Sequence, residues 1–254
     1  MEAHSIWFYL LVAVLLMGVL QSLSVGGLFF LKRSGELRAN AFYGVLLIVM
    51  GLTLLHNILL ISNLFEQRPK LQFLPIYFTL LFPPLLFYYV KLTLYPAYRL
   101  QRSDLKHFIL PLGQVLYFIA LYFDLVTFRG TPGRYFYSPF YGAFEHFLYI
   151  TTFFAYLYFA YRYIRHKERE GRRSKQARQV LYLKTLVRVL FLLFCIHTGF
   201  LVSEFISNEL LDINLRTVKI FAGLGALSFA ALVFWIGTYG FQVLLWGRKV
   251  FGSR

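Results

Sequence analysis

Charge and cysteine are both scarce in this chain of 254 residues. Asp, Glu, Lys and Arg make up 15% of it, whereas they make up roughly 25% of an ordinary soluble domain. The single cysteine, Cys195, excludes an internal disulfide and a cysteine-rich metal site. Acidic residues are the rarest charged group, with 11 against 26 basic ones and a net charge of +15. These deficits exclude a disordered chain, a disulfide-stabilised domain and an ordinary soluble enzyme.

Long apolar runs dominate the sequence, and 59% of its residues are hydrophobic. A helix needs about 20 mostly apolar residues to cross roughly 30 Å of hydrocarbon. Such runs predict an all-α polytopic membrane protein, a single domain of seven transmembrane helices. The predicted spans are about 6–31, 41–62, 71–94, 105–128, 141–164, 180–205 and 218–246.

The distribution of Lys and Arg predicts the orientation of these spans. The odd-numbered loops and the C-terminal tail carry 18 basic residues, and the even-numbered loops carry six. Because cytoplasmic loops are enriched in Lys and Arg, we expect the N-terminus outside and the C-terminus inside. This asymmetry accounts for most of the net charge, so we expect no direct nucleic-acid binding. The first span has no basic residue before it and is expected to stay uncleaved.

Ionisable and polar side chains fall in the outer half of the predicted bundle, where burial in lipid is costly. Three are histidines on three different spans, each roughly 8–12 Å below the outer surface at 1.5 Å per residue. They can form a ligand pocket open to the outside, or they can simply hydrogen-bond neighbouring helices. Their spacing matches no metal-binding motif, and we predict no metal or cofactor. The candidate ligand-binding residues are His56, Asn57, Asp124, Glu145, His146, His197 and Glu204.

Basic residues near the inner surface form a second candidate region. Lys184 and Arg188, one turn apart, can extend to the headgroups, pair with Gln21 or bind a lipid phosphate. The basic loop between the fifth and sixth spans can bind lipid or a partner protein, or it can only set the topology. Its candidate contacts are Arg172, Arg173 and Lys175. Separately, Pro83 and Pro84 predict a kink near the middle of the third span.

The stretch Phe82–Leu112 carries a family resemblance. It resembles the third and fourth spans of the seven-helix N-terminal regions of membrane-bound AraC-type regulators of bacteria. The matching residues are Pro84, Leu85, Leu86, Tyr88, Tyr89 and Val90, then Asp104, Leu105, His107, Phe108, Ile109 and Pro111. WIGTYGFQ, residues 235–242, resembles the last span of that family. The resemblance implies a sensor role. It does not extend to the family's DNA-binding domain, which we do not expect after Arg254.

The sequence therefore predicts a sensor-like or partner-binding module of the bacterial inner membrane, and not an enzyme. A ligand would bind in the outer half, and the basic inner face would contact a membrane or cytoplasmic protein partner, alongside membrane lipids. Oligomers are possible. Two alternatives stay open: a structural subunit of a larger membrane complex, and a small transporter or metal-dependent membrane enzyme.

Overall fold

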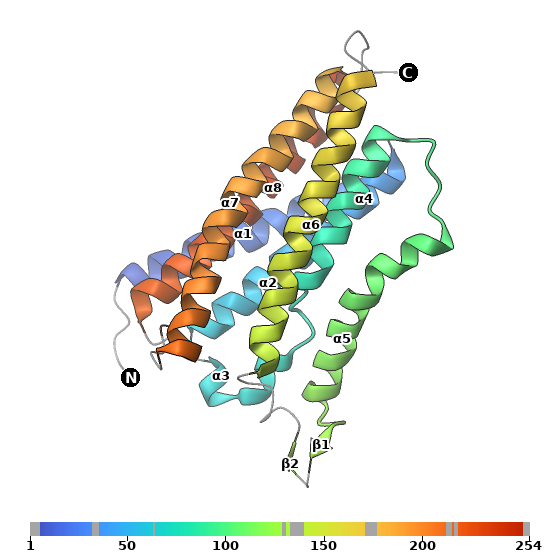
Figure 1. Cartoon of the computed structure of the whole chain (residues 1–254). Helices are drawn as coiled ribbons and strands as arrows, with labels where there is room; N and C mark the ends of the chain where they lie inside the picture. The colour runs from blue at the N-terminus through green and yellow to red at the C-terminus, as the bar shows by residue number, and fades with distance from the viewer. Residues whose placement is uncertain are drawn as a thin grey trace.

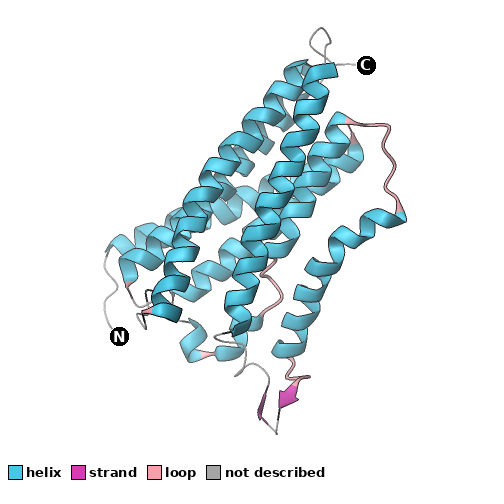
Figure 2. Ribbon diagram, viewed as in Figure 1, coloured by secondary structure: helices cyan, strands magenta, loops and turns pink. Residues whose placement is uncertain are grey.

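The computed structural model describes residues 6–31, 36–62, 64–128, 131–132, 140–170, 177–211, 215 and 218–250. Helix makes up nearly all of this (Figure 2). The α-helices are α1 (Ile6–Leu31), α2 (Leu37–Ile61), α3 (Leu64–Gln67), α4 (Phe82–Leu94), α5 (Ile109–Tyr122), α6 (Phe140–Glu170), α7 (Ala177–Leu210) and α8 (Lys219–Val250). Three 3-10 helices are η1 (Pro69–Phe73), η2 (Thr79–Leu81) and η3 (Arg102–Phe108). β1 (Thr127–Phe128) and β2 (Thr131–Pro132) form one short antiparallel pair.

In the part of the chain that the structure describes, five helical segments are long and apolar enough to cross a membrane: 6–31, 37–61, 102–122, 177–207 and 220–245. The segment Thr79–Leu94 is apolar but shorter. α6 has 31 residues, but its many tyrosines and its charged C-terminal end lower its hydropathy. The prediction of an all-helical chain is confirmed, and five helices have the length and apolar composition of membrane spans, whereas the seven spans and their orientation stay predictions.

The third predicted span, 71–94, is not one continuous helix. Leu74 precedes Pro75 and takes an extended conformation, with ψ of 130°, because the proline ring disfavours helical geometry in the residue before it. Pro83 and Pro84 lie in the first turn of α4, where the backbone N–H groups have no partner within the helix. The two prolines therefore begin a helix, and the expected kink near the middle of a span is wrong.

The fourth predicted span, 105–128, ends earlier than expected. Asp124 follows α5 in the left-handed region, with φ of 54°. The Leu125 N–H donates to the Ala120 carbonyl at 2.8 Å, which satisfies a carbonyl of the last turn. The chain then turns into β1, so the helix stops at Tyr122.

The bundle is organised around α4, the shortest of its main helices. All 13 residues of α4 are buried, and α4 packs against α2 and α6. α2 also contacts α1 and α8, and α7 joins α6 to α8. Figure 1 shows the first residues of α1 and the last residues of α8 at opposite ends of the bundle. We call the end that holds the C-terminus of α4, with the connection 95–101, the inner end and the opposite half of the bundle the outer half; both names follow the orientation that the sequence predicts.

The periphery is apolar. Large hydrophobic side chains of α1, α5 and α7 are exposed, among them Met17, Leu116 and Leu192. α5 rests mainly on η1, η2 and η3 and stands at one side of the bundle (Figure 1). Extensive exposed apolar surface of this kind is typical of helices that face lipid or another protein.

Candidate functional site

His56 of α2 lies inside the outer half of the bundle. Its ring centroid is 4.9 Å from that of Phe65 and 4.8 Å from that of Tyr77. The ring is buried, and its Nδ1 atom has no hydrogen-bond partner among the described residues. Asn57, the next residue, is only partly buried.

Gln114 of α5 connects three elements of the outer half. Its side-chain amide donates to the Thr79 hydroxyl at 3.0 Å and also to the Glu145 carboxylate of α6. Its carbonyl oxygen accepts the Leu80 backbone N–H at 3.2 Å. Glu145 therefore has a fixed partner. We call Thr79, Gln114 and Glu145 the outer network.

His197 of α7 is buried and bonded to α8. Its Nδ1 is 2.9 Å from the Ser228 hydroxyl, which itself donates to the Gly225 carbonyl at 2.6 Å. Since the Ser228 proton is already used, Nδ1 of His197 carries the proton in this bond. The centroid of the Tyr149 ring lies 6.2 Å from that of the His197 ring. His146 lies close enough to His197 for the two imidazoles to interact electrostatically.

The remaining outer candidates lie elsewhere. The Asp124 carboxylate pairs with the Lys70 ammonium at 2.6 Å, beyond the end of α5. Glu204 is partly exposed on α7. The structure thus brings His146 near His197 and places His56 beside Tyr77, while Asp124 forms a separate ion pair. Among the described residues no group of three or more His, Cys, Asp or Glu side chains could hold a metal ion.

Lys184 pairs with an acidic side chain of the neighbouring helix. Its ammonium lies 2.6 and 2.7 Å from the two carboxylate oxygens of Glu168, which joins α7 to α6. Gln21, the other partner considered, donates to Thr238 at 3.2 Å. Arg188 is exposed, whereas Arg172, Arg173 and Lys175 lie outside the described residues.

A second polar cluster, at the inner end, was not among the sequence candidates. Asp104 of η3 accepts the Tyr88 hydroxyl at 2.8 Å and the Tyr98 hydroxyl at 2.7 Å. It also accepts the Gln101 backbone N–H at 2.8 Å, which closes a capping box at the start of η3. Burial and the bond to Asp104 raise the pKa of Tyr98 to about 12.

Lys91 completes this cluster. Its ammonium lies 3.9 Å from Oδ1 of Asp104 and 3.6 Å from the centroid of the Tyr98 ring. The residue is only 9% exposed, which is rare for a lysine. Arg38 holds the overlying connection, because its guanidinium donates to the carbonyls of Pro96 at 2.7 Å and Tyr98 at 2.8 Å.

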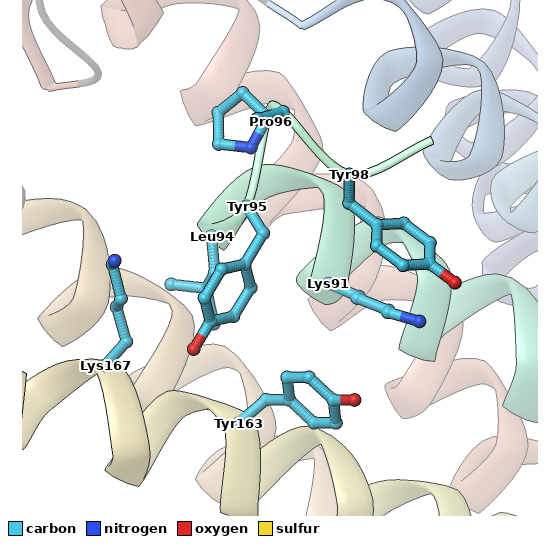
Figure 3. Close-up of a pocket in the computed structure, with 8 residues that line it drawn as sticks. Lys91, Leu94, Tyr95, Pro96, Tyr98, Tyr163 and Lys167 are labelled. Atoms are coloured by element: carbon cyan, nitrogen blue, oxygen red, sulfur yellow. The ribbon is translucent and has the colours of Figure 1, made fainter. Parts of the chain in front are cut away.

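A cavity of about 570 Å³ opens beside Lys91. Figure 3 shows Tyr95 between Lys91 on one side and Lys167 on the other, with Tyr163 below. We call it the inner cavity. Its lining residues are Lys91, Leu94, Tyr95, Pro96, Ala97, Tyr98, Tyr163 and Lys167.

The sequence gives little sign of the inner cluster, because Lys91 is one of the 18 basic residues whose distribution predicts the topology. One signal was present, since Tyr88 and Asp104 both belong to the stretch that carries the family resemblance. Gln114 carried no comparable signal, because a single amide in an apolar helix is not distinctive.

No family model, curated protein or solved structure matches this chain.

Proposed function

We propose that the protein is a non-catalytic, sensor-like module of the bacterial inner membrane, which recognises a ligand from the outside and acts through its basic inner face. In this proposal seven segments cross the membrane, with α4 and η2 forming the third and α6 the fifth. The N-terminus lies outside, as the excess of Lys and Arg at the other end favours. The resemblance of Phe82–Leu112 to sensor regions supports the same reading.

One observation carries the proposal: polar groups from several helices are buried in the outer half with bonding capacity left over. Nδ1 of His56, the Tyr149 hydroxyl and the Thr198 hydroxyl are buried without hydrogen-bond partners among the described residues. A buried polar group without a partner costs roughly 1–3 kcal/mol. A polar ligand that hydrogen-bonds to these groups recovers that free energy. Binding of such a ligand in the outer half is therefore favourable.

Cysteine accessibility tests the pocket. With Cys195→Ala as background, we expect His56→Cys in intact cells to react with a charged, membrane-impermeant thiol reagent. Leu54→Cys, on the same helix and fully buried in an apolar setting, is the matched control and should stay unreactive. If neither cysteine reacted, His56 would be a packed side chain that is closed to the outside, and the ligand-sensing proposal would fail.

The same assay tests orientation. Ala3→Cys and Thr131→Cys should react from outside, and Gly171→Cys should react only after the membrane is opened. If only Gly171→Cys reacted from outside, the predicted topology would be inverted.

Co-purification in mild detergent separates the sensor from a structural subunit. A sensor is expected to purify without a stoichiometric membrane partner. A fixed stoichiometric complex would favour the subunit alternative.

A further inference from the structure

The ammonium of Lys91 has no hydrogen-bond acceptor among the residues that the structure describes. Its nearest carboxylate oxygen, Oδ1 of Asp104, is 3.9 Å away, which is too far for a hydrogen bond. The Tyr98 ring offers a cation–π contact at 3.6 Å but accepts no conventional hydrogen bond. An ammonium has three donors, and here none is bonded to a described residue, although only 9% of the lysine is exposed.

Asp104 cannot supply the missing bonds in this arrangement. Its oxygens already accept from the Tyr88 hydroxyl, the Tyr98 hydroxyl and the Gln101 N–H. These donors hold the carboxylate at its observed distance from Lys91. Further acceptors for the Lys91 donors can be supplied by a group in the cavity that Lys91 lines.

The inner cavity has the chemistry to provide a site for an anion. Two of its eight lining residues are lysines, and no Asp or Glu lines it within the described part of the chain. The rest of the wall is aromatic or aliphatic, formed by Tyr95, Tyr163 and their neighbours (Figure 3). Lys167 is partly engaged, since its ammonium contacts Glu170 at 3.1 Å. Of the two lysines, Lys91 is thus the one whose N–H donors have no acceptor among the described residues.

We propose that the inner cavity binds a phosphate group joined to an uncharged carbon skeleton, with Lys91 donating to the phosphate oxygens and the tyrosine rings packing against the skeleton. Tetrahedral phosphate offers several oxygens to one ammonium. The cavity opens at the C-terminal end of α4, where the apolar helix stops. Two sources fit this chemistry: the headgroup of a phospholipid and a soluble phosphate ester.

Binding to the purified full chain in phosphate-free detergent tests this site. The probes are phosphatidylglycerol, measured by native mass spectrometry, and glycerol 3-phosphate, measured by calorimetry. Lys91→Met removes the cation, and Ala97→Trp fills the cavity without changing charge. Lys106→Met is the control, because Lys106 is an exposed lysine near the same connection that does not line the cavity.

We expect at least a tenfold weaker affinity in Lys91→Met and in Ala97→Trp, about 1.4 kcal/mol, and no change in Lys106→Met. Binding of the lipid alone assigns the site to a headgroup, whereas binding of glycerol 3-phosphate assigns it to a soluble ester. Equal binding by all four proteins would show diffuse charge attraction and overturn the proposal, as would no binding at all.

Ala97→Trp keeps the test decisive if Lys91→Met does not fold. Full binding by Ala97→Trp would place the anion outside the cavity and also overturn the proposal. Because the inner cavity and the outer histidines are separate, failure here leaves the proposed sensing function to its own experiment.

Discussion

Replacement of Asp104 by asparagine is expected to destabilise the protein more than any other conservative change of a single carboxylate among its described acidic residues. The amide has the shape of the carboxylate, but it has one acceptor oxygen and no charge. The other oxygen position becomes an NH₂ donor. That donor would face the Tyr88 and Tyr98 hydroxyls or the Gln101 N–H, all of which now donate to the carboxylate.

The magnitude follows from burial. The side chains of Lys91 and Asp104 are each 11% exposed, and breaking a buried charge pair by removing one partner costs about 3–5 kcal/mol. Asp124→Asn is the control, because its pair with Lys70 is more exposed, at 25% and 55%. Exposed pairs contribute about 0–1 kcal/mol, so this variant should remain close to the wild type.

A double-mutant cycle isolates the charge interaction. Lys91→Met removes the ammonium that Asp104→Asn leaves unbalanced, so the double variant should be less destabilised than the sum of the single variants. We expect a coupling free energy on the order of 1–3 kcal/mol. The measurement is reversible unfolding in mixed micelles, followed by circular dichroism. Additive effects within about 0.5 kcal/mol, or an Asp104→Asn variant as stable as Asp124→Asn, would refute the reasoning.

Three further outcomes are expected. Gly44→Val should destabilise the contact between α1 and α2, because a Cβ at Gly44 would lie 3.0 Å from the Gly26 carbonyl oxygen; a wild-type midpoint in the same micelle assay would contradict this. The pKa of Tyr98 is raised to about 12 from an ordinary value near 10, so its stabilising contribution is complete below about pH 10 and lost by about pH 12. Tyr98→Phe should therefore flatten the alkaline limb of the stability curve, and an unchanged limb would argue against it. Finally, Gln114→Leu should alter the thiol reactivity of Ala97→Cys in a cysteine-free background if the two ends are coupled, and identical rates would indicate independent ends.

The fold was largely predictable because a membrane reduces the choice to long apolar helices. The runs that became α1, α2, α7 and α8 were visible from composition alone. The run 71–94 was different, since counting apolar residues ignored Pro75 and Pro83. One proline breaks the helix and the other lies at the start of the next, and a turn and the 3-10 helix η2 lie between them.

The candidate sites were predictable in part. The cost of polar groups in lipid correctly indicated that His56 and His197 are buried. The partners of these groups depend on how each helix is rotated about its axis. The spacing of apolar residues does not predict this rotation when a helix is apolar on every side. Lys91 and Asp104 meet only because the chain reverses at 95–101, and a count of loop charges contains no such geometry.

α4 and the residues just before it link the two polar regions. Thr79 and Leu80 of η2 are bonded to Gln114 in the outer network, and α4 begins directly afterwards at Phe82. At its other end the same helix supplies Tyr88 to Asp104 and Lys91 to the inner cavity. A helix of 13 residues buried on every side moves as a unit, because close-packed surroundings leave it few alternative positions. α4 is therefore the physical path by which a rearrangement of the outer network that shifts η2 would reach Lys91, and the thiol reactivity of Ala97→Cys in the Gln114→Leu variant measures whether it does.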